Sequence, residues 1–105
     1  MSNDDKVTTP SNLRAEALSI LAEIPHTFIA LANTEIANNR YHFVSSLRDV
    51  HREIATAFGE PRPANLGVLA IADDLTRWVN IWTWHPYAER WVAQLADLVE
   101  EEHVA

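Results

Sequence analysis

Apolar residues recur at steps of three and four from about residue 67 to residue 84, which is the period of a helix with one buried face. These positions are Val68, Ile71, Ala72, Leu75, Trp78, Val79 and Trp82. The opposite side is polar, and there Asp73 and Arg77 have the i, i+4 spacing of a surface ion pair. Trp84 follows the polar Asn80 by four residues and is in line with this row. The pattern therefore predicts a helix that buries its other tryptophans and leaves Trp84 near the surface.

Pro86 cannot donate a backbone hydrogen bond and disfavours helical geometry at His85, so the first helix is predicted to stop near Trp84 and a second to begin with Pro86 in its first turn. Its apolar stripe consists of Ala88, Trp91, Val92, Leu95, Leu98 and Val99. Because the joint between the two helices is so short, we expect them to pack as neighbours or to meet at a corner. The aromatic rings then gather near that joint.

The residue pattern in the first third of the chain predicts a tail followed by one helix. Residues 1–10 show no periodicity and are expected to form a flexible N-terminal tail. A helix is predicted from about Ser11 to Ile24, where Pro25 ends or kinks it. Its apolar face consists of Leu13, Ala17, Ile20, Leu21 and Ile24. We expect a single all-α domain over residues 11–102, with residues 103–105 frayed.

Residues 26–58 are compatible with one long helix or with two. The apolar positions are Ile29, Ala32, Ile36, Phe43, Leu47, Val50, Ile54 and Ala57. They keep one phase through Asn38 and Asn39, which favours a single helix of roughly 50 Å at about 1.5 Å per residue. The weak helix formers around Asn39 favour a break there instead. We expect the long helix, ended by a Gly59 cap, and keep the split near Asn39 as the alternative.

Together these elements predict an all-α fold, a small helical bundle of four helices with one long central helix, or of five helices if that helix splits near Asn39. A helix that long outreaches the shorter helices available to cover it, so part of its apolar stripe would need a second chain. We therefore expect a homodimer. The predicted dimer stripe consists of Ile36, Phe43, Leu47, Val50 and Ile54.

Composition narrows the class of protein. With 105 residues, of which 48% are hydrophobic, the chain fits one domain with a modest core. It has no cysteine, which excludes disulfides and thiolate metal sites. No apolar run approaches the ~18 to 20 residues that a membrane span needs, and the polar N-terminus does not have the apolar core of a secretory signal. We expect a cytoplasmic protein that contacts no membrane.

Charge argues against a nucleic-acid partner. The formal net charge of −7 comes from fifteen acidic and eight basic residues, whereas phosphate backbones require a basic face. Four of the acidic residues are close to the C-terminus: Asp97, Glu100, Glu101 and Glu102. An acidic DNA-mimic inhibitor is therefore kept as a further alternative, although the body of the chain is closer to neutral.

The candidate chemical groups do not form a recognisable catalytic or metal motif. Glu23/His26 and Glu100/His103 have a Glu-x-x-His spacing, but Pro25 interrupts the first pair and the second lies in the frayed terminus. We expect no metal, no cofactor and no enzymatic activity. His51 lies on an apolar helix face and is expected to be a boundary histidine with one hydrogen bond. The alternative is a small-molecule-binding helical protein or enzyme with a pocket near His51 and Trp82.

The aromatic residues around the helix joint provide the leading functional hypothesis. An exposed tryptophan beside tyrosine, histidine and arginine has the composition of a protein-binding hot spot. The residues of this predicted partner-binding site are Trp84, His85, Tyr87, Arg77 and Arg90. The sequence therefore predicts a non-enzymatic protein-interaction module that regulates or inhibits a partner protein through an aromatic-rimmed helical surface.

Overall fold

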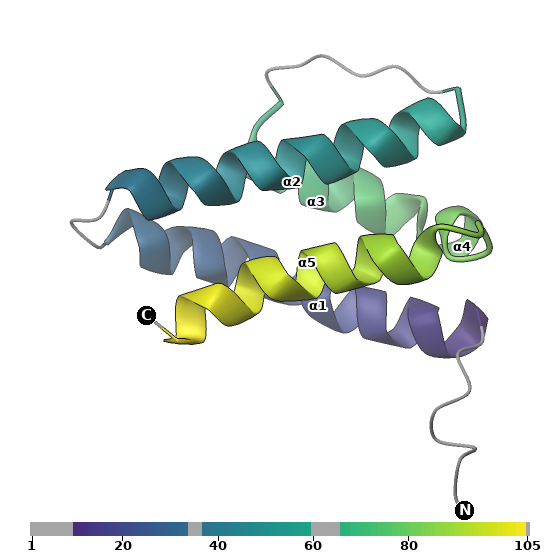
Figure 1. Cartoon of the computed structure of the whole chain (residues 1–105), viewed down its shortest axis with the longest axis horizontal. Coiled ribbons are helices and arrows are strands. Elements are labelled where there is room, and N and C mark those ends of the chain that lie inside the picture. The colour runs from purple at the N-terminus through teal and green to yellow at the C-terminus, as the bar shows by residue number, and fades with distance from the viewer. Residues whose placement is uncertain (1–9, 34–36, 60–65, 105) are drawn as a thin grey trace, which may run out of the picture.

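The chain is all-α, as predicted. A computed structural model describes residues 10–33, 37–59 and 66–104, and within these ranges it contains helices and no strand. The helices are α1 (Pro10–Ala32), α2 (Ala37–Ala57), α3 (Val68–Arg77), α4 (Val79–Trp82) and α5 (Ala88–Val104) (Figure 1). The predicted tail lies outside the described residues, except for Pro10, which begins α1.

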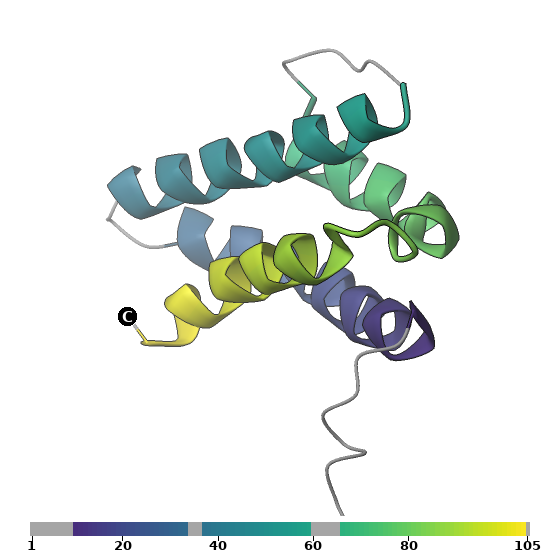
Figure 2. The ribbon, with the colours of Figure 1, turned by 45° about the vertical axis from the view of Figure 1, so that its right-hand side comes forward.

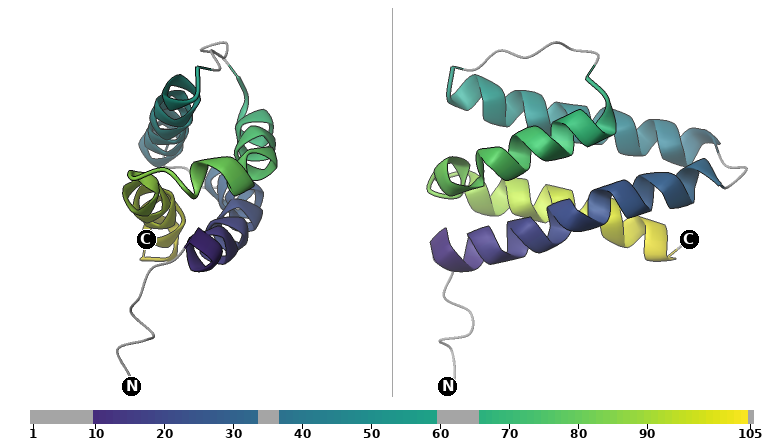
Figure 3. Two further views of the ribbon diagram at one scale, coloured as in Figure 1. Left: turned by 90° about the vertical axis from the view of Figure 1, so that its right-hand side faces the viewer. Right: turned by 180° about the vertical axis from the view of Figure 1, so that it is seen from behind.

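The helices are arranged in two layers. Viewed end-on, α2 and α5 form one layer, and α3 and α1 form the other (Figure 3, left). The short helix α4 and the turn after it carry the chain from the layer of α3 to the layer of α5 (Figure 2). The bundle measures 44 × 35 × 16 Å along its principal axes. The turn between α4 and α5 lies at one end of the bundle (Figure 1).

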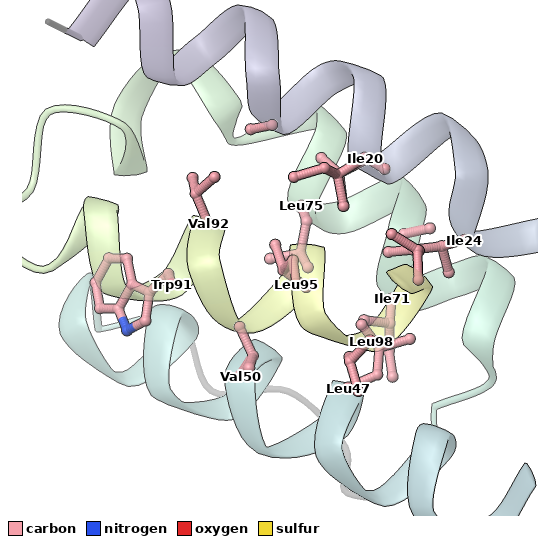
Figure 4. Packing of buried hydrophobic residues seen from close by; sticks show 14 of the residues in the cluster. Ile20, Ile24, Leu47, Val50, Ile71, Leu75, Trp91, Val92, Leu95 and Leu98 are labelled. Atoms are coloured by element: carbon pink, nitrogen blue, oxygen red, sulfur yellow. The ribbon is translucent and has the colours of Figure 1, made fainter. Parts of the chain in front are cut away.

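Side chains from both layers meet in one hydrophobic core. Figure 4 shows Ile20 and Ile24 of α1 facing Leu95 of α5, with Leu75 of α3 beside them. Helix α2 closes the core from the other side. Burying one large aliphatic side chain contributes roughly 1.5 to 3 kcal/mol, so this shared core is what holds the short helices in place. Trp82 and Trp91 are completely buried in it, as predicted, whereas Trp78 is only partly buried against it.

The first helix does not end at Ile24 as predicted, because α1 continues through Pro25 to Ala32. A proline inside a helix removes one backbone hydrogen bond and its ring crowds the preceding turn. Residues on both sides of Pro25 nevertheless pack in the core, among them Ile24 and Leu31. Their burial offsets the local cost of the proline, which the hydrophobic pattern could not show.

The single long helix predicted for residues 26–58 is wrong. Helix α1 ends at Ala32 and α2 begins at Ala37, so the chain is split, but before Asn39 and not at it. Asn38 and Asn39 lie inside α2. The predicted glycine cap at the far end of α2 is confirmed, because Gly59 has a φ of 68°.

The split removes the surface that was predicted to form a dimer. Phe43, Leu47, Val50 and Ile54 are all buried in the core of a single chain, and Ile36 lies outside the described residues. Folding α2 back on α1 covers the stripe that one long helix would have exposed. The homodimer remains a prediction, and it no longer has this stripe as its interface.

The helix predicted over residues 67–84 is broken at Trp78. Helix α3 ends at Arg77 and α4 begins at Val79, and Trp78 between them has a φ of −94° and a ψ of 3°. The Trp82 indole N–H spans the break and donates to the Leu75 carbonyl at 2.9 Å. The predicted surface pair of Asp73 and Arg77 is confirmed at 3.2 Å. The second helix of this region begins at Ala88, so Pro86 precedes it and does not lie in its first turn as predicted.

Helix α1 is more apolar than the sequence analysis assumed. Its segment Asn12–Ala32 is long and apolar enough, by length and composition, to cross a membrane. One third of that window is buried inside the bundle, including Ala17 and Leu21. The core helix of a globular protein meets the same criterion, so the expectation of no membrane contact stays a prediction.

Candidate interaction site

Helix α4 and the turn that follows it expose three large apolar side chains within seven residues. Trp84 is 73% exposed, which confirms its predicted place at the surface, and it is joined by Ile81 and Tyr87, which are 57% and 52% exposed. We call Ile81, Trp84 and Tyr87 the aromatic corner. Backbone hydrogen bonds hold this turn, for example from the Trp84 amide to the Ile81 carbonyl at 3.2 Å. The exposure of Trp84 is thus built into an ordered turn.

Behind the aromatic corner lies a cluster of contacting rings. The His85 ring centroid is 4.7 Å from that of the buried Trp91 and 5.3 Å from that of Tyr87. Phe58, at the end of α2, packs edge-on against His85 at 5.7 Å. The Tyr87 backbone N–H donates to His85 Nδ1 at 3.0 Å, which orients the imidazole. These contacts fix His85 and Tyr87 against the bundle.

Arg90 joins the ring cluster to α2. Its guanidinium carbon lies 4.5 Å from the centroid of the Tyr87 ring, which is cation–π geometry. The same guanidinium donates through Nη2 to Glu53 Oε2, across the boundary between α5 and α2. Two of the predicted site residues, Tyr87 and Arg90, are therefore in direct contact, and Glu53 is a partner that sequence reasoning missed.

Glu53 is influenced by a second group from α5. The Trp91 ring nitrogen is turned toward α2 and is buried without a hydrogen bond of standard geometry (Figure 4). Its N–H is nevertheless the main influence that lowers the pKa of the Glu53 carboxyl, against the opposing effect of partial burial, and Arg90 lowers the pKa further. Glu53 is therefore held as a carboxylate.

A groove runs along the boundary of α2 and α5 beside this contact. One part has a volume of about 480 Å³ and is lined by Asp49, Arg52, Glu53, Thr56, Ala57, His85, Tyr87 and Trp91. A smaller part of about 230 Å³ is lined by His42, Ser46, Asp49, Val50, Glu53, Gln94, Asp97 and Leu98. The two parts share Asp49 and Glu53. We call them together the α2–α5 groove.

Arg77 is not part of this arrangement. It lies on α3, in the other layer, and pairs there with Asp73 and with Asp74 of its own helix. Its predicted place in the partner-binding site with Trp84 depended on one continuous helix, with both residues on its polar side. The break at Trp78 changes the direction of the chain between them.

His51 lies in a buried polar cluster and lines neither part of the α2–α5 groove. Its Nε2 is 3.1 Å from Asp74 Oδ2, and His51 and Asp74 are only 4% and 1% exposed. The Trp78 ring stacks parallel to the imidazole at 5.8 Å. The predicted single hydrogen bond is present, but the histidine is buried and not at the boundary. A histidine and an aspartate form an acid–base pair in many enzymes, but here both are closed off from solvent, and the pair connects α2 to α3.

The sequence contained a signal for Asp74 that was missed. Asp74 follows Ile71 by three residues and precedes Trp78 by four, so it falls within the apolar phase of its helix. An acidic residue in such a position needs a buried partner. Trp82, the other residue suggested for a small-molecule pocket, is fully buried and also lines neither part of the groove.

The Glu-x-x-His pairs do not come together into a metal site in the described part of the chain. Glu23 and His26 are exposed on α1, and the side chain of His103 lies outside the described residues. Within the described ranges, no three His, Asp or Glu side chains are grouped so that they could hold a metal ion.

Comparisons of the chain with protein-family models, with curated proteins and with solved structures found no match. The geometry of the aromatic corner and of the α2–α5 groove is therefore the basis for a functional proposal.

Proposed function

We propose that the protein is a non-enzymatic interaction module that docks its aromatic corner onto a partner protein and so regulates or inhibits that partner. The observation that carries this proposal is the 73% exposure of Trp84 in a chain that buries Trp82 and Trp91 completely. An indole left in water gives up a few kcal/mol of burial free energy, which docking would recover.

The composition and rigidity of the surface support the same proposal. Tryptophan, tyrosine and arginine are the residue types enriched at the energetic centres of protein interfaces, and here they are Trp84, Tyr87 and Arg90. The ring contacts of His85 hold Tyr87 against the bundle before a partner arrives. A preorganised surface loses less conformational entropy on binding than a mobile one.

The test compares partner capture by the wild-type protein, by Trp84→Ala and by a control variant. Ile29→Ala is the control, because Ile29 is also a large exposed apolar residue, at 58%, but lies on α1. Proteins captured from a lysate are quantified by mass spectrometry, and the affinity of each candidate is then measured with purified components. We expect Trp84→Ala to weaken binding of the true partner at least about 30-fold, the ~2 kcal/mol of a hot spot, and Ile29→Ala to leave it unchanged.

Both variants should fold, because neither side chain is in the core. Urea denaturation and circular dichroism check this directly. Equal loss of capture by both variants, or no loss with Trp84→Ala, would contradict the proposal.

A further inference from the structure

Carboxylates line both parts of the α2–α5 groove. Asp49 and Glu53 line both parts and Asp97 lines the smaller one, and among the described residues of the lining the only arginine or lysine is Arg52. Arg52 is already paired with Asp49 at 3.2 Å. Asp97 makes no ion pair with any residue in the described ranges. A partner that fits this groove by charge complementarity is therefore positively charged.

The chain itself shows which cation the groove accepts at its aromatic end. The Arg90 guanidinium lies over the Tyr87 ring and is bonded to Glu53, so a guanidinium meets an aromatic face and a carboxylate together. This combination suits a planar cation better than a compact ammonium. Arg90 reaches this position from the rim of the groove and is itself half exposed. The ion pair between Arg90 and Glu53 is therefore a surface contact of modest strength. A better placed guanidinium can replace Arg90 in it.

We infer that the partner docks with an arginine-containing peptide segment that lies along the α2–α5 groove and places one guanidinium between Tyr87 and Glu53, where it displaces Arg90. Further basic residues of the segment would face Asp49 and Asp97. This inference rests on the proposed function, because it names the chemistry of the partner that meets the aromatic corner.

The state of Glu53 fits a cationic ligand and disfavours an anionic one. Glu53 is a carboxylate at neutral pH, as an ordinary glutamate is, and the Trp91 N–H and Arg90 keep its pKa lower still. The three carboxylates of the groove, Asp49, Glu53 and Asp97, repel phosphates and acidic peptides. The groove joins the aromatic corner through Tyr87, which belongs to both surfaces. A basic segment can thus occupy the groove while an apolar surface of the partner covers Trp84.

The test uses defined peptides and a local probe. The four tryptophan indole N–H groups give separate NMR signals, and Trp91 reports on the groove while Trp84 reports on the corner. The ¹⁵N-labelled protein is titrated with a peptide of alternating arginine and alanine, with the same peptide carrying citrulline for arginine, and with its glutamate counterpart. We expect the Trp91 signal to shift only with the arginine peptide. Equal shifts with the citrulline peptide, which has the same shape without the charge, would overturn the inference.

A ligand with a single arginine distinguishes a peptide-binding site from a site for a small molecule. N-acetyl-arginine methylamide offers one guanidinium and no neighbours. We expect it to bind at least about tenfold more weakly than the arginine peptide, because it has no further guanidinium that could face Asp49 and Asp97. Equal affinity of the two would show a pocket for a small guanidinium compound and would overturn the peptide assignment.

Two variants test the exchange with Arg90. Glu53→Gln removes the carboxylate and should weaken binding of the arginine peptide at least about fivefold. Arg90→Ala removes the competing guanidinium and should tighten binding by about two- to fivefold, which a merely structural role of Arg90 would not produce. Arg14→Ala is the matched control, since it removes one positive charge from an exposed position on α1. A tightening as large with Arg14→Ala as with Arg90→Ala would indicate a general charge effect and contradict the inference.

The same variants distinguish this inference from the proposed function. If partner capture depends on Trp84 but is unchanged by Glu53→Gln, and the arginine peptide does not bind, the interaction module stands and the arginine assignment fails. If the arginine peptide binds through Glu53 but Trp84→Ala has no effect on capture, the groove is a binding site and the aromatic corner is not its anchor.

Discussion

His51 Nε2 and Asp74 Oδ2 lie 3.1 Å apart in the interior of the bundle and form a polar link between α2 and α3. Asp74 is also bonded to Arg77 through its other oxygen, so both carboxylate oxygens have partners. A buried carboxylate with such partners is specific to one arrangement of the two helices, because any shift leaves a buried charge unpaired.

Removal of Asp74 should therefore be strongly destabilising. We expect Asp74→Ala to lower the free energy of unfolding by about 3 kcal/mol, since it leaves the buried His51 without its acceptor and removes one of the two acceptors of Arg77. Urea denaturation measures the effect. The control is Asp73→Ala, whose bond to Arg77 is exposed and whose loss should cost less than about 1 kcal/mol. Similar losses for the two variants would show that the buried pair has no special role.

The two glycines of the chain should respond differently to alanine. Gly59 has a φ of 68°, in the left-handed region, whereas Gly67 has a φ of −75° and a ψ of 166°, which any residue adopts. Apart from chain neighbours, no atom of the described residues lies within 4 Å of a Cβ added at either position, so the comparison isolates the backbone. We expect Gly59→Ala to reduce stability by about 1 kcal/mol and Gly67→Ala to change it by less than about 0.5 kcal/mol. The midpoint of urea unfolding reports the difference, and equal midpoints would argue against a left-handed cap at Gly59.

Pro25 should be a site where a single substitution stabilises the fold. Pro25→Ala restores the backbone donor that the interior of α1 lacks, and we expect thermal unfolding to show a gain of at least about 1 kcal/mol. His26→Ala, at an exposed neighbouring position, should change stability by less than about 0.5 kcal/mol. A loss of stability in Pro25→Ala would mean that the fold requires the proline ring or a kink at that point.

The contribution of Glu53 to stability should depend on pH. Its pKa in the folded protein lies below the ordinary value of 4.5, chiefly because of Trp91 and then Arg90, so the folded state favours the carboxylate. This contribution is fully present above pH 4.5 and is lost as the pH falls through the lower folded pKa. We expect Glu53→Gln to melt at a lower temperature than the wild-type protein at pH 7. The difference between the two melting temperatures should shrink as the pH is lowered.

The control for this pH experiment is Glu16→Gln, which removes one negative charge from an exposed position on α1. A gap for Glu53→Gln that widens as the pH is lowered would have the wrong sign and would contradict the assigned pKa direction.

Much of the fold follows from periodicity alone. The spacing of Trp82 and Trp91 on the apolar faces of their helices predicted burial for both, and the place of Trp84 in the polar row predicted its exposure. These predictions succeed because side-chain direction along a helix is set by local geometry, with 3.6 residues in each turn. The all-α class and the Gly59 cap have the same local origin.

What periodicity could not supply is where helices stop and which of them meet. A hydrophobic phase can continue across a break, as it does between α1 and α2, because both helices face the same core. Helix α1 continues through Pro25 because packing on both sides of it outweighs the local cost of a proline inside a helix. From the sequence alone, that cost predicts the end of the helix. The partners of Arg90 and His51 are also non-local, and Glu53 and Asp74 were not recognised as site residues.

The sequence by itself determined which face of each helix is apolar, because that depends only on residue order and helical geometry. The tertiary structure alone decided that α2 folds back to bury Phe43, Leu47, Val50 and Ile54, and that α5 brings Arg90 and Trp91 against Glu53. The physical reason is that contacts between residues far apart in the chain form only when the whole bundle closes, and the free energy of that closure is shared by all of its helices.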